Sequence, residues 1–525
     1  MTRQRLVVVG GGMAATRLVE HLAGAGLTDG GRGYDVTVVG EEPVPAYNRI
    51  LLSAVLEGTH PHDALTLRDP GWYAARGVRL RLGTRVLEVD REARELHLVD
   101  GDRLPWDRLV LATGSIPTLP PVRGLVQVDG RLDPRVHAFR SVADCLGLLG
   151  ALPGSTRAVV VGGGLLGLQV ARALSVRGLA TDLVEGADHV LHRQVGAAAG
   201  ALLARELRRL GTEVCTGVRA TRLTPDGVRL DTGRVLDADL VVLAAGGRPS
   251  TALARRAGLA CRRGVLVDDR LTSSTDPRVH ALGDCAEHGG LTSGFVGPAW
   301  DQAEVLAQVL VEEVGPTATA TTTAATTTAT AGPPGRAPAA YAGVRTVARL
   351  RATGLDVAVL GDPERAEGEV VEMTNPVTRS HRRLVVRDGR IVAAALVGDL
   401  SRVGLITQHH DQRTVLGPRE PGELLLAETT APPPALPDEA EVCACAGATA
   451  GAVRGCRSLA EARETTRATT GCGGCRGTVE RLLGEDPGTR SHARNRSGTP
   501  LTRPLPSVAT TATTRPASRS GKDLR

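Results

Sequence analysis

Four cysteines in the last hundred residues have the spacing of metal ligands. They form a C-x-C pair at Cys443 and Cys445 and a C-x-x-C pair at Cys472 and Cys475. Thiolates from two close pairs can ligate a 2Fe-2S cluster, and soft thiolates also suit structural zinc. The tight C-x-C pair favours the iron–sulfur cluster over zinc, and an incomplete site is the third alternative.

The first of two glycine-rich turns follows a β-branched run at residues 6–9. It has a G-x-G-x-x-A pattern with Gly10, Gly12 and Ala15 in the defining positions, and a helical stretch comes next. In this context the glycines let the backbone approach a pyrophosphate, and the helix N-terminus offers unpaired N–H groups. Glu41 follows the next strand, where a carboxylate would bind a ribose diol, although the loop before it is longer than usual.

The second turn follows a similar run at residues 158–161. It is a full G-x-G-x-x-G pattern at Gly162, Gly164 and Gly167, and Glu185 ends the next strand at close to the usual interval of ~20 residues. An acidic side chain there would repel the 2′-phosphate of NADPH, so NADH is favoured and NADPH is the alternative. Two complete patterns predict two dinucleotide sites rather than glycine turns in ordinary βαβ units.

Short apolar strands alternate with helical stretches through residues 1–313. Runs that are apolar on both faces indicate parallel sheets covered by helices, so we predict an α/β fold with two Rossmann-like three-layer dinucleotide-binding domains. Farther on, two β-branched runs flank Asp388-Gly389, which is typical of a hairpin turn. This region is expected to form a small α+β domain.

Two further segments resemble flavin-contacting parts of the flavoprotein disulfide reductase superfamily. They contain Thr113-Gly114 and the Gly-Asp pair that ends at Asp284. The resemblance implies that the first glycine turn binds FAD, that the NAD domain is inserted in the FAD domain, and that Asp284 holds the ribityl chain; a plain turn residue is the alternative. A helix from about Pro298 would then point its N-terminus at the flavin.

Disulfide reductases of that superfamily need a C-x4-C pair soon after the first βαβ unit, whereas the first cysteine here is Cys145. In that place stands a stretch with Tyr47, Asn48 and Arg49. It resembles the NAD(P)H-binding half of the assimilatory nitrite reductase large subunit and its rubredoxin reductase relatives. The resemblance implies that these three residues lie near the isoalloxazine and the pyrophosphate, and a surface loop is the alternative.

The segment around the four metal-type cysteines resembles the bacterioferritin-associated ferredoxin-like domain, a small helical 2Fe-2S domain that occurs within nitrite reductase large subunits. The interval between Cys445 and Cys472 is a few residues shorter than in that domain, so one helix is expected to be shorter. The remaining cysteines lack such partners and are expected to be buried small side chains: Cys145, Cys215, Cys261, Cys285 and Cys456.

Composition supplies the remaining boundaries. Residues 315–340 are almost entirely Thr, Ala, Pro and Gly, as in a linker. Residues 486–525 hold eight basic and two acidic side chains, which account for the whole formal charge of +6, and are expected to be a disordered basic tail. The resemblance to the flavoprotein superfamily implies an FAD-binding domain at 1–120 plus 237–313 and an NAD(P)H-binding domain at 121–236. The rest of the expected division is a linker at 315–340, an α+β domain at 341–425, a 2Fe-2S domain at 438–485 and a tail at 486–525.

Other classes of protein are disfavoured. An aromatic content of 2% leaves few stacking platforms for nucleic acid, so no nucleic-acid partner is expected. No apolar run approaches the ~18 residues that span a bilayer, and no signal peptide is recognised, so we expect a cytoplasmic protein without a membrane partner.

Together these features imply an oxidoreductase in which NADH reduces FAD and the 2Fe-2S cluster takes electrons one at a time. No catalytic side chain is expected. The resemblance implies a terminal nitrate or nitrite reductase as the partner, or else a small electron carrier, and a homodimer is possible. Because no cysteine follows Cys475, nitrite itself is expected to be reduced on another polypeptide. The alternatives are a rubredoxin or ferredoxin reductase, an NADH oxidase and a flavin/iron–sulfur redox sensor.

Overall fold

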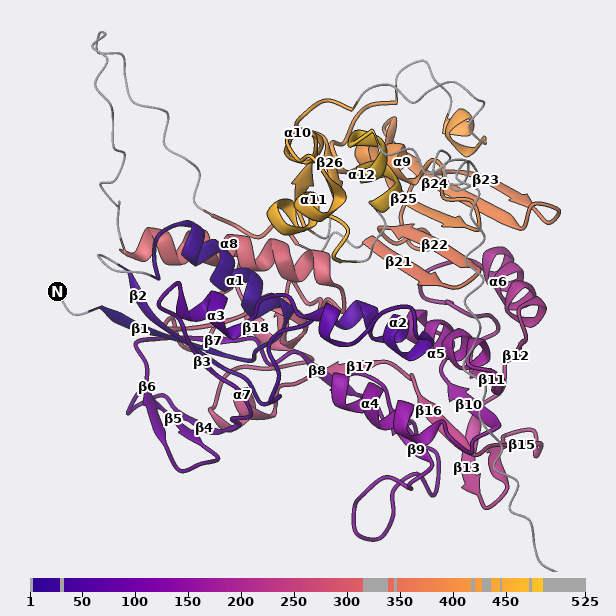
Figure 1. Cartoon of the computed structure of the whole chain (residues 1–525), viewed down its shortest axis with the longest axis horizontal. Helices are drawn as coiled ribbons and strands as arrows, with labels where there is room; N and C mark the ends of the chain where they lie inside the picture. Colours follow the sequence, from indigo (N-terminus) through magenta and orange to yellow (C-terminus); the bar gives the residue numbers. More distant parts are fainter. Residues whose placement is uncertain are drawn as a thin grey trace, which may run out of the picture.

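The computed structural model describes residues 3–28, 33–314, 339–343, 347–416, 421–426, 436–443, 446–471 and 475–484. Nearly all of the predicted linker and the whole basic tail lie outside these residues, as do Cys445 and Cys472. Figure 1 shows two sheet-containing bodies side by side, with a third sheet and a small helical unit above them.

The first body is built on a parallel five-stranded sheet of order β19-β7-β1-β2-β3. Its strands are β1 (Gln4–Val9), β2 (Tyr34–Val39), β3 (Arg79–Arg81), β7 (Arg108–Leu111) and β19 (Val279–Ala281). Helices α1 (Met13–Gly24) and α8 (Val296–Val314) pack side by side against it. Val9 lies opposite both Val39 and Leu111, so the carboxyl ends of three strands meet at one edge.

Smaller elements complete this body. They are α3 (Pro70–Ala74), α7 (Ala252–Arg256), the antiparallel sheet of β4 (Val86–Asp90), β5 (Glu95–Leu98) and β6 (Arg103–Pro105), and the pair β18 (Val265–Val267) and β20 (Ala286–His288). The short helix α2 (Leu52–Glu57) belongs to this part of the chain but buries its apolar side chains in the core of the second body. Trp106 is fully buried beneath the sheet with Leu6, Val8 and Leu109 in one apolar cluster. Val, Leu and Ala supply most of this core, as the low aromatic content requires.

The second body repeats the plan with a parallel sheet of order β12-β11-β10-β16-β9. Its strands are β9 (Val136–Ala138), β10 (Arg157–Val161), β11 (Ala180–Glu185), β12 (Thr212–Thr216) and β16 (Leu240–Leu243). Its other elements are α4 (Val142–Ala151), α5 (Leu165–Val176), α6 (Ala197–Arg209) and the antiparallel sheet of β13 (Ala220–Thr224), β14 (Gly227–Leu230) and β15 (Val235–Asp237). The predicted α/β fold class with Rossmann-like units is confirmed.

The chain crosses between the two bodies on a pair of short strands. β8 (Ser115–Pro117) and β17 (Gly247–Pro249) pair antiparallel, one on the way out and one on the way back. The predicted return at residue 237 is therefore wrong, because β16 still pairs with β10 in the second sheet. The apolar run at residues 240–243 fits either sheet, and only its strand pairing decides between them.

The α+β unit is an antiparallel sheet of order β21-β22-β25-β24-β23 with one helix. The elements are β21 (Val347–Ala352), β22 (Leu355–Leu360), β23 (Glu369–Asn375), β24 (Ser380–Arg387), β25 (Arg390–Val397) and α9 (Val403–Asp411). Arg387 pairs with Arg390 across Asp388-Gly389, which confirms the predicted hairpin. Leu350 and Val357 share an apolar cluster with Leu174 and Leu207 of the second body, so this unit is fastened by a common core.

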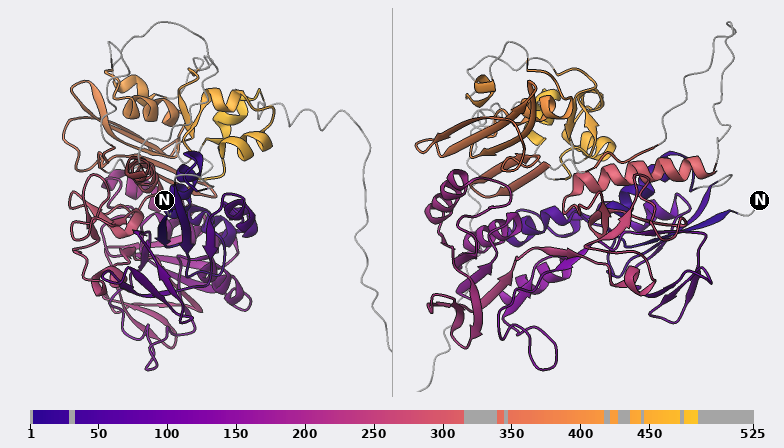
Figure 2. Two further views of the ribbon diagram at one scale, coloured as in Figure 1. Left: turned by 90° about the vertical axis from the view of Figure 1, so that its left-hand side faces the viewer. Right: turned by 180° about the vertical axis from the view of Figure 1, so that it is seen from behind.

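The small helical unit, which we call the cysteine module, comprises the described residues from 436 to 484. It contains β26 (Glu441–Cys443), β27 (Ala448–Thr449), α10 (Ala450–Arg454), α11 (Leu459–Thr466) and α12 (Arg476–Leu482). The views in Figures 1 and 2 place it over α1 and α8, next to the antiparallel sheet. In the part of the chain that the structure describes, no helix combines the length and the apolar character needed to cross a membrane.

Candidate functional site

A cavity of about 960 Å³ opens at the carboxyl edge of the first parallel sheet. Its wall includes the turn between β1 and α1, the ends of β2 and β7, and the start of α8. The other parts of the chain also contribute: Leu166 from α5, Ala348 from β21, and Cys443 and Cys475 from the cysteine module. The cavity is therefore a junction of all four units, large enough for a dinucleotide.

The first glycine turn forms one side of this cavity. Gly10 has φ +117°, and a Cβ there would lie 2.1 Å from the carbonyl oxygen of Ala112, so only glycine fits. Gly12 precedes α1 and faces open space in the cavity wall. Ala15 does not line the cavity but is buried in the helix–sheet core, where the third motif position is expected to pack. The turn thus presents backbone and a helix N-terminus to the cavity.

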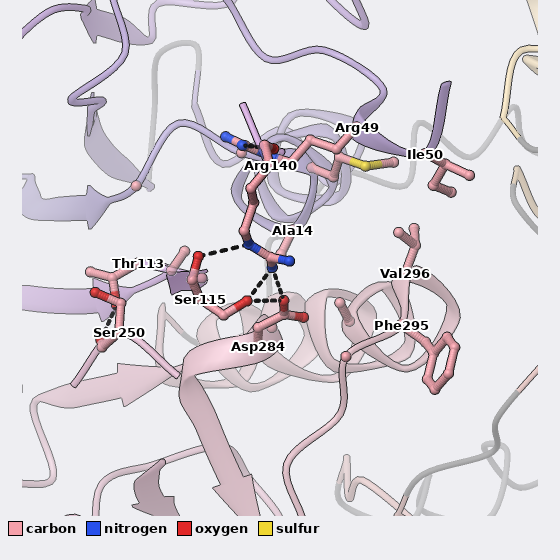
Figure 3. Close-up of a pocket in the computed structure, with 18 of the residues that line it drawn as sticks. Ala14, Arg49, Ile50, Thr113, Ser115, Arg140, Ser250, Asp284, Phe295 and Val296 are labelled. Atoms are coloured by element: carbon pink, nitrogen blue, oxygen red, sulfur yellow. Dashed lines mark hydrogen bonds and ion pairs between the residues drawn. The ribbon is translucent and has the colours of Figure 1, made fainter. Parts of the chain in front are cut away.

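Asp284 lines the same cavity, on a turn that approaches Ala14 at the start of α1, and is held in a polar network (Figure 3). Its Oδ2 accepts hydrogen bonds from the Ser115 hydroxyl at 2.6 Å and from the Arg140 guanidinium at 2.7 Å. Arg140 also donates to the backbone carbonyl of Ser115 at 2.9 Å. Neither Ser115 nor Arg140 was predicted, because neither stands in a recognisable motif; the position of Arg140 just before the capping box of α4 is its only local signal.

The other predicted flavin contacts from the end of β7 lie in the same wall. Thr113 lines the cavity, and its hydroxyl donates to the carbonyl oxygen of Ser250 at 2.8 Å, which ties the end of β7 to the returning chain. Gly114 lines the cavity with φ +65°, a conformation that favours glycine.

Of the predicted stretch Tyr47 to Arg49, the structure brings two residues to the cavity. The Tyr47 hydroxyl donates to Glu42 at 2.8 Å and accepts from the backbone N–H of Val142 at 2.9 Å, and burial raises the pKa of this phenol. Arg49 forms an ion pair with the same Glu42. Glu42, which sequence reasoning missed, therefore orients both side chains.

Asn48 lies beside the cavity wall, and its contact with the flavin stays a prediction. It is 1% exposed and does not line the cavity. Its Oδ1 accepts from the backbone N–H of Ile50 at 3.1 Å, and its Nδ2 donates at 2.8 Å to the carbonyl oxygen of Thr470 in the cysteine module. The side chain thus joins two units.

Glu41 lies at the cavity rim just beyond β2, as the motif requires. Its side chain is 72% exposed and stands 3.8 Å from Arg85. A carboxylate in this position is accessible to a ribose diol, whereas Arg85 neutralises part of its charge.

The second glycine turn has the same geometry in the second body. Gly162 has φ +117°, and Gly164 caps the N-terminus of α5. A Cβ on Gly167 would lie 1.7 Å from the carbonyl oxygen of Gly162, so helix and turn touch here. Glu185 is 9% exposed and accepts hydrogen bonds from the backbone N–H groups of Gly163 at 2.7 Å and Ala187 at 2.8 Å. The acid is therefore fixed beside the turn.

Two of the four predicted metal ligands can be placed. Cys443 and Cys475 are 4% and 6% exposed, belong to one apolar cluster and line the cavity. The backbone N–H of Thr469 donates to Cys475 Sγ at 3.1 Å, the kind of contact that thiolate ligands of iron–sulfur clusters receive. In the described residues no group of three His, Cys, Asp or Glu side chains could hold a metal ion, and Cys445 and Cys472 fall outside them.

The other cysteines take no part in this cavity. Cys145 and Cys285 are buried as predicted, and burial raises the pKa of Cys145 to about 11, so its thiol is unreactive. The prediction of burial was wrong for three partly exposed cysteines, namely Cys215, Cys261 and Cys456.

The residues around the cavity fit a flavin dinucleotide. Backbone N–H groups at the start of α1 suit a pyrophosphate, the Asp284 oxygens suit a polyol, and the N-terminus of α8 borders the cavity through Val296 and Ala299. Gln302, in the second turn of α8, accepts from the backbone N–H of Gly283 at 2.7 Å and so fixes the turn that carries Asp284. Apolar walls from Met13 and Ile50 suit a ring system.

The chain belongs to the pyridine nucleotide-disulphide oxidoreductase family, whose model matches residues 4–309, and it is an oxidoreductase. Residues 347–411 match the rubredoxin NAD+ reductase C-terminal domain. The family implies FAD and a nicotinamide dinucleotide as cofactors.

Curated relatives extend the match beyond these domains. A nitrite reductase [NAD(P)H] of Bacillus subtilis (strain 168) is 32% identical over 92% of this chain and 58% of its own length. The assimilatory nitrate reductase electron transfer subunit of the same strain is 30% identical over 92% of this chain and 60% of its own. The chain thus spans about 60% of the length of these relatives.

A solved structure shares the fold. The covalent putidaredoxin reductase–putidaredoxin complex superposes with a TM-score of 0.68 at 24% identity, over 81% of this chain and 96% of that chain.

Proposed function

We propose that the chain is an NADH-dependent FAD and 2Fe-2S electron-transfer oxidoreductase that supplies a separate terminal reductase in nitrate or nitrite assimilation. The observation that carries this proposal is the position of Cys443 and Cys475, which line the same cavity as Gly10, Gly12 and Asp284. Cofactors held by these two sets of residues would be neighbours, so electrons need no diffusing carrier between them.

The roles of the chain's own residues follow from their contacts. Gly10, Gly12 and the N-terminus of α1 would bind the pyrophosphate of FAD, and Glu41 its ribose. Asp284, fixed by Ser115 and Arg140, would hold the ribityl chain. When bound, FAD accepts a hydride from a nicotinamide and releases electrons singly, a conversion that needs no acid or base from the protein.

In the second body, Gly162, Gly164 and Gly167 would bind the pyrophosphate of NADH, and Glu185 would accept hydrogen bonds from its ribose hydroxyls. The carboxylate disfavours the extra phosphate of NADPH. Cys443, Cys445, Cys472 and Cys475 would ligate the cluster, with the Thr469 N–H stabilising the thiolate of Cys475.

The name of the Bacillus subtilis electron transfer subunit supports a separate terminal reductase as the partner. The likeness to putidaredoxin reductase supports the related alternative, a small electron carrier as acceptor. An NADH oxidase needs no one-electron relay, so a cluster site beside the flavin argues against that function. A redox sensor needs no continuous oxidation of NADH, so steady turnover would argue against it.

Steady-state assays separate these functions. The protein loaded with FAD and iron–sulfur cluster should oxidise NADH continuously with an artificial one-electron acceptor, and faster than with oxygen alone. Nitrate or nitrite should be reduced only when the terminal reductase is added. If NADH is not oxidised steadily with any acceptor, the redox-sensor alternative is favoured. If the rate of NADH oxidation depends on oxygen and not on the added acceptor, the NADH oxidase is favoured.

A further inference from the structure

A four-residue segment of the cysteine module, Arg467 to Thr470, connects the predicted cluster site to the FAD-binding body. Thr469 in its middle donates its N–H to Cys475 Sγ at 3.1 Å, and Thr469 and Arg467 both have positive φ, 67° and 57°. Each end of the segment contacts the other body, so a displacement of the segment would move Cys475.

Arg467 makes the first contact. Its guanidinium forms an ion pair with Glu20 on α1, the helix whose N-terminus is the first glycine turn. The side chains of Arg467 and Glu20 are only 14% and 10% exposed, and Arg68 also donates to Glu20, at 2.8 Å. Burial lowers the pKa of Arg467, and Glu20 is the opposite charge that compensates it.

Asn48 makes the second contact. Its buried carboxamide donates to the carbonyl oxygen of Thr470 at 2.8 Å while accepting from Ile50. Ile50 and the neighbouring Arg49 line the cavity. Contacts therefore hold the two ends of the segment against two elements, α1 and the loop before α2. Both elements border the cavity predicted to bind the flavin.

Apolar packing does not fix the position of the cysteine module on the first body. Among the described residues, the apolar cluster of the module consists of its own side chains alone, from Val442 to Leu483. The α+β unit, in contrast, shares a core with the second body through Leu350 and Val357. Interfaces without a common apolar core permit relative motion of the units, so the polar contacts decide where the module lies.

We propose that Glu20–Arg467 and Asn48–Thr470 form a latch that positions Cys475 at the flavin cavity. Glu20, Asn48 and Arg467 are then positioning residues rather than ligands of any cofactor. This inference rests on the proposed function only where it concerns electron transfer; the docking of the module can be measured without it.

The test compares Arg467→Ala with the conservative Arg467→Lys and with Arg457→Ala. Arg457 lies on the same module, is 93% exposed and, among the described residues, has Glu461 of the same module as its ion-pair partner, so it is a matched control. Hydrogen–deuterium exchange of the full-length, cofactor-loaded protein reports on docking. Arg467→Ala should raise exchange in the peptide covering residues 47–52 by about ten-fold, the effect of one lost hydrogen bond to a charged group, and leave α10 and α12 unchanged.

A second readout is rapid mixing with NADH. Flavin bleaching should be as fast in Arg467→Ala as in the parent, whereas subsequent cluster reduction should be slowed about ten-fold and partly restored in Arg467→Lys. Equal exchange and equal cluster reduction in Arg467→Ala and Arg457→Ala would overturn the latch. If the parent's cluster is never reduced by NADH, the proposed function fails, and the exchange data still decide the latch.

Discussion

Gly167→Ala should impair NADH binding while sparing FAD. A Cβ at this position would lie 1.7 Å from the carbonyl oxygen of Gly162, where a normal contact needs about twice that distance, so the turn before α5 must move by about 1 Å or more. Overpacking of this kind costs ~1–3 kcal/mol. If that cost falls on the pyrophosphate-binding conformation, NADH affinity drops by roughly 5- to 150-fold.

The assay is a titration of flavin reduction with NADH in anaerobic protein, together with the FAD content from absorption. Gly147→Ala is the matched control, because Gly147 lies in the exposed face of α4, has open space where the Cβ would be and gains helix propensity. An unchanged NADH affinity in Gly167→Ala, with a normal unfolding temperature, would refute the assignment of this turn. Loss of FAD together with NADH binding would show that the change acts on the whole fold.

Three further variants test the FAD site, the choice between NADH and NADPH, and the carboxyl of Glu441. Asp284→Ala should lower FAD retention about ten-fold in equilibrium dialysis, because Ser115 and Arg140 lose their acceptor; unchanged retention would contradict the ribityl role. Glu185→Ala should reduce the preference for NADH over NADPH in kcat/KM, and an unaltered ratio would separate this acid from the ribose site. Partial desolvation in the cavity wall and the nearby carboxylates of Asp411 and Asp301 raise the pKa of Glu441, so its contribution to stability is present at acid pH and lost as pH rises through that pKa. Glu441→Gln should therefore raise Tm at pH 7 and not at pH 4, and an equal effect at both would exclude charge repulsion.

Motifs made of backbone geometry were predictable from the sequence. The glycine turns depend on local rules, and the structure gives Gly10 and Gly162 the same positive φ of +117°. Strand periodicity and the Asp388-Gly389 turn were likewise local signals. The predicted boundary at residue 237, where the chain was expected to return to the first body, was too early. The sequence of strand β16 is apolar throughout and does not indicate which of the two sheets it joins.

Contacts between distant residues were not predictable. Arg140 reaches Asp284 across 144 positions of sequence, and Asn48 reaches Thr470 across 422. A single Arg or Asn has no periodicity that would reveal its partner. Tyr47 and Arg49 line the cavity whereas Asn48 between them does not, because Asn48 bonds to the cysteine module packed against this stretch.

The central claim is that one chain holds a flavin and a 2Fe-2S cluster in electronic contact. The most direct measurement is the electron paramagnetic resonance spectrum of anaerobically purified protein, before and after addition of NADH, with iron and zinc quantified in the same sample. We expect the signal of a reduced 2Fe-2S cluster that develops with NADH and is absent in Cys475→Ser, which keeps its FAD. Stoichiometric zinc without iron, or a cluster that NADH cannot reduce, would contradict it.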